Sequence, residues 1–331
     1  MVRFITRRLL WLIPVLFAVT LITFLLMHAA PGGPWDRDPG RRQIDAATQA
    51  RLDHEFGLDK PMWRQYVAYV VGDVDDEGRF VCGAVCGNLG PSYRQRGRTV
   101  QEILFSVPEG KQVWQSRFGY SIRLGLLALI VSIVVGIPAG ILAALKQNSW
   151  IDYVSALVAN IGVSIPAFVI AVYLIILFGV QLGWVSVIPR SWDKPGVWVI
   201  PALVLGFGTM AFTARLTRSS MLEIMRHDYV RTARAKGLAE RVVILGHMLK
   251  NALIPVVTIL GPSLANLVTG SFIIETMFSF PGIGREYVTA IGNRDYSMIL
   301  GSTLVYAVLV ALANLSVDLV YGFLDPRIRV Q

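Results

Sequence analysis

Residues Asp228–Pro255 read DYVRTARAKGLAERVVILGHMLKNALIP, a basic polar segment between two strongly apolar runs. From Arg215 to Lys250 the chain carries eight Lys or Arg residues and only three acids. Because positive charge beside membrane spans is retained in the cytoplasm during insertion, the segment predicts a cytoplasmic loop. Within it, Arg231–Gly237 contains good helix formers closed by a glycine, which predicts a short helix. Such a helix fits a groove on a cytoplasmic partner; the alternative is a solvated loop that touches lipid headgroups.

The composition is that of a membrane protein. Hydrophobic residues make up 54% of the 331 residues and charged residues only 16%, which indicates a polytopic, all-α membrane protein. The net charge of +9 is better explained by topology than by nucleic acid, since no nucleic-acid motif is present. The sequence has no phosphate-binding GxxxxGK[ST] loop, no HExxH, no GxSxG and no zinc-ligand spacing. We therefore expect no catalytic residues, no metal site and no cofactor held by this chain.

Six apolar runs predict six membrane spans. The first, Leu9–Met27, is nineteen residues long, enough to cross about 30 Å of hydrocarbon as a helix. Basic residues precede it and His28-Ala29-Ala30 follows it, as in a signal peptide, but the run is too long for a typical signal core, so we favour an uncleaved anchor. The other five runs lie at about 120–145, 152–181, 197–217, 252–275 and 297–324.

The distribution of positive charge predicts the topology and three regions. These are residues 1–30 with the first span, a long extracytoplasmic loop at 31–117, and a five-helix core at 118–331 with a cytoplasmic loop at 219–250. Most Lys and Arg of the short loops then fall inside, which places both termini in the cytoplasm. Within the outer loop, Ile44–Phe56 and Met62–Val71 favour amphipathic helices on the outer face of the membrane.

The predicted spans are rich in glycine and proline. In membranes these residues allow close helix contact and local bending. Ordinary helix packing is the favoured role for most of them, although a protein that alternates between two arrangements would use the same residues as pivots. The residues are Gly136, Pro138, Gly140, Gly162, Pro166, Pro201, Gly206, Gly208, Pro255, Gly261 and Pro262.

Short motifs along nearly the whole chain resemble those of one family, the dipeptide and oligopeptide permeases of ABC importers. The loop around Arg231–Gly237 resembles the ATPase-contacting loop of these permeases, which lacks the Glu-Ala-Ala start of the wider superfamily. Gly33 departs from the Asp common in the family, and residues 74–86 and 108–115 look like insertions. The other matching motifs are Pro31-Gly32-Gly33-Pro34, Asn88-Leu89-Gly90-x-Ser92, Gly136-Ile137-Pro138-Ala139-Gly140, Ser164-Ile165-Pro166, Pro281-Gly282-Ile283-Gly284, Arg294-Asp295-Tyr296 and Leu324-Asp325-Pro326-Arg327.

The resemblance implies a type I ABC importer permease fold and a non-catalytic role in the bacterial or archaeal cytoplasmic membrane. The chain would form half of a translocation pathway for dipeptides or oligopeptides, and a homologous permease would form the other half. Two cytoplasmic subunits would bind and hydrolyse ATP with Mg, and an extracytoplasmic binding protein would deliver the peptide. The residues implied to contact an ATPase subunit are Asp228, Tyr229, Arg231, Thr232, Ala233, Arg234, Ala235, Lys236 and Gly237.

Polar residues inside spans are costly, which makes them candidates for the pathway or for bonds between helices. We expect Asp318 to pair with a basic group near the cytoplasmic face, and Glu275 to reach water at the outer end of the fifth span. Cys82 and Cys86 lie in the outer loop, where a disulfide is favoured over free thiols. The pathway candidates are Asn160, Ser164, Asn266, Thr269 and Asn314.

Two alternatives remain at this stage. Permeases for other small solutes, such as nickel or glutathione, share many of these sequence motifs. A stand-alone channel or secondary transporter needs no ATPase loop and often carries charged residues in mid-span. This chain has the loop and lacks a convincing network of mid-span charges.

Overall fold

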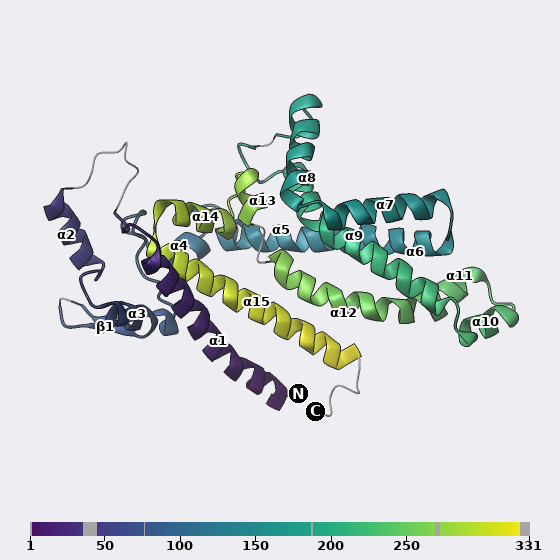
Figure 1. The fold of residues 1–331 in the computed structure, drawn as a ribbon, viewed down its shortest axis with the longest axis horizontal. Helices are drawn as coiled ribbons and strands as arrows, with labels where there is room; N and C mark the ends of the chain where they lie inside the picture. Colours follow the sequence, from purple (N-terminus) through teal and green to yellow (C-terminus); the bar gives the residue numbers. More distant parts are fainter. Residues whose placement is uncertain (1, 36–44, 76, 187, 269–271, 325–331) are drawn as a thin grey trace. The chain divides into compact units, whose positions relative to one another are not determined.

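The computed structural model describes residues 2–35, 45–75, 77–186, 188–268 and 272–324, and these are predominantly helical (Figure 1). The chain divides into two compact units, which are described separately below. The first combines Met1–Tyr120 with Pro281–Ala311, and the second combines Ser121–Phe280 with Leu312–Gln331. Each unit thus brings together segments that are far apart in the sequence.

The first unit contains the first long helix, the outer-loop segment and the start of the last long helix. Its small elements have clear local causes. Asp45 caps α2 by accepting a hydrogen bond from the Thr48 amide, and Thr99 with Glu102 forms a capping box at α4. The elements are α1 (Val2–Ala29), α2 (Ala46–Glu55), α3 (Met62–Val70), β1 (Gly72–Val74), β2 (Phe80–Cys82), η1 (Ala84–Cys86), α4 (Val100–Phe105), η2 (Val113–Gln115), α14 (Ile283–Asn293) and the start of α15 (Tyr296–Leu324).

The second unit is a helical bundle in which α9 contacts α6, α7, α8 and α12. These four helices lie next to α9 in Figure 1. Three of its segments, η3, η4 and η6, are π-helical turns within longer helices. The elements are most of α5 (Arg117–Val131), η3 (Ser132–Gly136), α6 (Ile137–Leu145), α7 (Trp150–Ser164), α8 (Ala167–Leu174), η4 (Ile175–Gln181), η5 (Pro195–Trp198), α9 (Val199–Ile224), α10 (Asp228–Ala235), α11 (Glu240–Val242), η6 (Val243–Met248), α12 (Leu249–Val268) and α13 (Phe272–Met277).

Among the described residues, five continuous helices are long and apolar enough to cross a membrane, and there is a sixth span if one bent pair counts as a span. The bent pair is Trp150–Ser164 with Ala167–Gln181, which meet at 110°. The apolar run predicted as the third span, over 152–181, therefore contains two helices. Pro166 explains the bend, because a proline pushes the preceding residue out of the helical region, and Ile165 has extended backbone angles. Local bending at a proline of the spans was itself expected.

The fifth span also differs from its prediction. Its helical segment runs over Glu240–Leu267, whereas hydropathy predicts 252–275. Together with the end of α9 at Ile224, this shortens the link between the fourth and fifth long helices to residues 225–239. Hydropathy did not detect that the helix begins at Glu240, because residues 240–250 include several polar residues. A hydropathy window reports apolar content rather than backbone conformation.

Glycines produce close contact between α6 and α9. A Cβ atom on Gly140 would lie 2.4 Å from the carbonyl oxygen of Ala214 and 2.6 Å from Cβ of Thr217. A Cβ on Gly136 would lie 2.8 Å from the carbonyl oxygen of Met210. These separations leave no room for any side chain, so the predicted packing role is confirmed at both positions.

Candidate functional site at helix α10

Helix α10 connects the ends of the fourth and fifth long helices. It ends at Ala235, and Gly237 follows with φ of +75°, a left-handed conformation that glycine adopts without strain. The Gly237 amide donates to the Arg234 carbonyl at 2.9 Å, which satisfies one of the terminal carbonyl groups of the helix. The predicted short helix closed by this glycine is confirmed, and it begins at Asp228.

One face of α10 packs into the core of its own unit. Val230 and Ala233 are buried there, and Ala233 is only 6% exposed. They belong to a cluster with Ala144 of α6, Met221 of α9, Val243 and Met248 of η6, and Ala252 of α12. The small Ala233 is thus used to approach this chain's own spans. Its packing explains how α10 is held against the ends of three long helices.

The opposite face of α10 is exposed. Asp228, Arg231, Thr232 and Ala235 are spaced as residues of one helical face, and all four are exposed. We call these four residues the outer face of α10. Within this face, Arg231 Nη1 lies 3.8 Å from Asp228 Oδ1 in an exposed ion pair. Arg234 Nη2 donates to Glu240 Oε1 at 2.6 Å, and this bond raises the pKa of Arg234.

A polar contact also ties α10 to α12. Asn251 Nδ2 donates to the Tyr229 hydroxyl at 2.9 Å. Together with the buried Val230 and Ala233, this contact joins α10 to α12 through both a polar and an apolar interaction. A short helix held in this way is suited to pass a displacement to the spans as a unit.

A buried ion pair connects α7 to α9. Arg218 donates from Nε and Nη2 to the two carboxylate oxygens of Asp152, at 2.5 and 2.7 Å. The Asn148 amide adds a third hydrogen bond at 3.0 Å, and Asp152 is buried. Our sequence analysis missed Asp152. The available signal was an acid at the start of an apolar run, which is costly unless it is paired.

Glu275 does not reach water, contrary to the prediction. It is fully buried and accepts a hydrogen bond from Ser121 Oγ at 2.8 Å. Glu275 lies in α13, which contacts α8 and α9 in the same unit. Hydropathy reports apolar content and does not show which side chains these helix contacts cover.

The predicted pathway residues lie on three different helices. Asn160 and Ser164 are exposed and occupy one face of α7, one turn apart. Asn266 on α12 and Asn314 on α15 are exposed as well. Thr269 lies outside the described residues, as do the side chain of Asp318 and its predicted ion pair.

In the first unit, two motifs that are distant in the sequence meet at Asp295. Ser92 Oγ donates to Asp295 Oδ2 at 2.5 Å, and the Tyr93 amide donates to Oδ1 at 3.2 Å. The same carboxylate accepts the Met298 amide at 3.2 Å and so caps α15. The Asn88–Ser92 motif and the Arg294–Tyr296 motif therefore form one structural anchor for the outer-loop segment.

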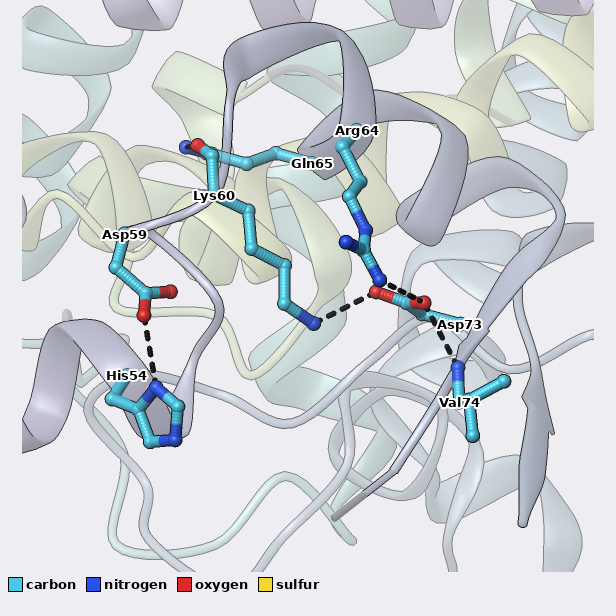
Figure 2. A network of polar contacts seen from close by, with 7 residues as sticks. All are labelled: His54, Asp59, Lys60, Arg64, Gln65, Asp73 and Val74. Carbon is cyan, nitrogen blue, oxygen red and sulfur yellow. Dashed lines mark hydrogen bonds and ion pairs between the residues drawn. The ribbon is translucent and has the colours of Figure 1, made fainter. Parts of the chain in front are cut away.

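A polar network fixes the turn between α2 and α3 to the β-hairpin (Figure 2). Asp73 accepts Lys60 Nζ at 2.8 Å, the Val74 amide at 2.9 Å and Arg64 Nη2 at 3.3 Å. These contacts lower the pKa of Asp73 from 3.8 to about 2, and the hydrogen bond from Lys60 has the largest effect. Because the pKa of Asp73 is lower in the folded protein than in the unfolded one, its ionised carboxylate stabilises the folded state at pH values above 3.8. This contribution to folding stability is lost as the pH falls from 3.8 through about 2.

Cys82 and Cys86 are joined in the structure, with their Cα atoms 5.9 Å apart. The bond links the end of β2 to η1. We predict that mass spectrometry of unreduced peptides from the native protein finds the two residues linked, because an oxidising compartment preserves such bonds. Two thiols that react with an alkylating reagent before reduction would contradict this prediction.

Among the described residues, no group of three or more His, Cys, Asp or Glu side chains is placed to hold a metal ion. Three features of the second unit surround the segment that the sequence singled out. They are an exposed helical face, a buried cluster beneath it, and close helix contacts that lead away from it.

Comparisons with known proteins give a consistent assignment. Residues 136–330 match the family model of the binding-protein-dependent transport system inner membrane component, and residues 1–112 match that of the N-terminal part of such membrane components. The dipeptide transport system permease protein DppB of Bacillus subtilis is 36% identical over 331 residues, which cover 100% of this chain and 99% of that protein. The di/tripeptide permease protein DppB of Pseudomonas aeruginosa is 39% identical and covers 100% of both chains.

A solved structure supports the fold. A chain of the inward-facing MetNI methionine ABC transporter superposes with a TM-score of 0.51 at 20% identity, covering 63% of this chain and 94% of that chain. At this level of identity the match concerns the fold alone, and it agrees with the expected type I importer permease fold. The chain belongs to the family of binding-protein-dependent transport system inner membrane components, and it is an integral inner-membrane permease of that family.

Proposed function

We propose that this chain is the permease subunit of an ATP-driven importer of dipeptides and oligopeptides. The observation that carries the proposal is full-length similarity, at 36 to 39% identity, to permeases named for dipeptide or di/tripeptide transport. The chain lines half of the pathway and does no chemistry itself. A homologous second permease lines the other half, two ATPase subunits hold ATP and Mg, and an extracytoplasmic binding protein delivers the peptide.

The arrangement of α10 supports the coupling part of this proposal. A motion of the ATPase subunits applied to the outer face of α10 passes through Val230 and Ala233 to α6, α9 and α12. The contact of Gly140 with α9 and the Asp152–Arg218 ion pair then carry it to the neighbouring helices. Each of these contacts is either closely packed or an ion pair. Contacts of this kind can transmit a change between two conformations of the helices.

Ala233 needs a role different from the one we expected. We propose that it supports α10 from beneath, while Ala235 and Arg231 on the outer face meet the ATPase subunit. Exposed Ala235 leaves space for close approach, and Arg231 supplies a charge for acids or carbonyl groups of the partner.

The exposed polar residues of the spans suit a pathway shared by two subunits. Asn160, Ser164, Asn266 and Asn314 are exposed in the single chain, as residues that face a second subunit across a pathway are. We propose these four, with Thr269, as lining residues. Amides and hydroxyls fit a peptide cargo because they can donate to and accept from its backbone.

The topology is testable by labelling. We propose that both termini are cytoplasmic and that residues 31–117 are extracytoplasmic, on the basis of the Lys and Arg distribution. Single cysteines that replace the exposed Ala50 and Ala239 should react with an impermeant thiol reagent from opposite sides of the membrane. Labelling of both from the same side would contradict the topology.

Transport assays test the substrate. The importer should be reconstituted from this chain and the permease, ATPase and binding-protein genes that accompany it. We predict ATP-dependent uptake of a labelled dipeptide that unlabelled peptides inhibit and that nickel or glutathione does not. Uptake of nickel or glutathione without inhibition by peptides would replace the proposed substrate and leave the importer architecture intact.

A further inference from the structure

Helix α3 packs beside the membrane-crossing part of α1. The Tyr66 hydroxyl donates to the Phe17 carbonyl at 3.0 Å and lies 2.9 Å from Thr20 Oγ1. The Tyr66 ring contacts those of Phe17 and Phe24, with centroids 5.6 and 5.3 Å apart. Tyr66 is therefore seated against α1 over two helical turns.

The position of these contacts along α1 gives the depth of α3. The candidate span is Thr6–Ala29, and Phe24 and Phe17 precede its end by 5 and 12 residues. At a rise of 1.5 Å per residue, the contacts fall about 8 to 18 Å below the Ala29 end. An outer-loop helix that binds α1 at this depth lies beside hydrocarbon, below the level of the headgroups.

The side of α3 that α1 leaves uncovered is apolar. Trp63, Val67 and Val71 follow one another at intervals of four residues and are 69%, 43% and 51% exposed. We call these three residues the α3 stripe. Exposing such an apolar stripe to water costs free energy, and a Trp at its start is typical of the boundary between headgroups and acyl chains.

We propose that the α3 stripe inserts into the leaflet that holds the Ala29 end of α1, with lipid acyl chains as its partner. This is the outer leaflet in the topology proposed above. Lipid is favoured over a protein because α3 contacts α1 at the depth of the hydrocarbon, and α1 also exposes apolar side chains such as Ile22 and Leu26. Arg64, on the neighbouring face, is half-exposed and pairs with Asp73, so its charge stays at the polar rim.

The helix α2 supplies the contrast. Its exposed residues are mainly polar or small, and its Ala50 is exposed without an apolar stripe around it. The structure therefore separates the two outer-loop helices that the sequence had placed together on the membrane surface. Helix α3 enters the leaflet and α2 stays in water.

Depth-dependent quenching tests the proposal. A fluorescent thiol label would be placed at Val67→Cys, with Leu26→Cys on α1 as the lipid-facing control and Ala50→Cys on α2 as the aqueous control. The native cysteines are paired and do not react. The full chain, with the subunits that co-purify with it, would be studied in nanodiscs containing lipids with a quencher on the acyl chain.

The label at position 67 should be quenched by these lipids about as strongly as that at 26, and several-fold more than that at 50. Aqueous iodide should quench only the label at 50. Iodide quenching at 67 would show a solvent-facing stripe, and protection from both quenchers would show a protein partner; either result overturns the proposal. Val71→Cys, on the same stripe, should repeat the result for 67 if the label itself does not disturb α3.

Discussion

Gly140→Ala should destabilise the protein by about 1–3 kcal/mol, the usual cost of overpacking a tight core. The added methyl group would lie 2.4 Å from the Ala214 carbonyl oxygen and 2.6 Å from Thr217 Cβ. Neither neighbour is the end of a flexible side chain, so α6 and α9 must separate. Thermal unfolding of the purified chain in detergent would measure the loss as a lower midpoint temperature.

Gly246→Ala is the matched control for this prediction. Gly246 is an exposed helical residue in the same unit, and nothing lies within 4 Å of an added Cβ. Alanine is the better helix former by about 1 kcal/mol, so this variant should be as stable as the parent or more stable. If both variants unfold at the parent temperature, the close contact between α6 and α9 does not exist in the protein.

Ala235→Trp should abolish substrate-stimulated ATP hydrolysis and peptide uptake while the chain still inserts and folds. Ala235 is exposed at the C-terminal end of the outer face of α10, so we expect a large side chain there to extend away from this chain. It would fill the space that we propose a partner subunit to occupy. We expect uptake to fall about tenfold or more; a loss of about 1.4 kcal/mol of binding free energy would by itself weaken the contact tenfold.

Two comparisons make that result interpretable. Ala239→Trp introduces the same side chain at an exposed residue beyond the helix and should leave uptake near the parent value. Ala233→Glu places a charge in the buried cluster and should lower the thermal stability of the chain itself. Normal uptake in the Ala235 variant, with the assembly intact, would refute a functional contact at this face.

The sequence predicts most of the helices because long apolar runs and glycine stops are local signals. The helix at α10 follows from residues 228–237 alone, and so does its end at Gly237. The sequence predicts a bend at Pro166, because a proline restricts the backbone of the residue before it. The angle of 110° depends on packing and cannot be predicted in this way. Packing of this kind is set by residues distant in the sequence.

The orientation of individual side chains was harder to predict. Ala233 and Ala235 are identical residues two positions apart in one short helix, yet one is buried against three long helices and the other faces outward. Glu275 was assigned to water because hydropathy could not reveal that α13 packs against α8 and α9. The role of Asp152 depends on its ion pair with Arg218, which lies 66 residues further along the sequence and could not be identified as its partner from local sequence.

The central claim is that the outer face of α10 touches an ATPase subunit, and site-specific photo-crosslinking tests it most directly. A photoreactive amino acid at position 235 of the assembled transporter should crosslink this chain to an ATPase subunit. The same amino acid at Trp114, an exposed residue of the outer-loop segment, should give no such product. An ATPase crosslink from position 235 alone is the predicted result, and its absence in an assembly that still hydrolyses ATP would contradict the account.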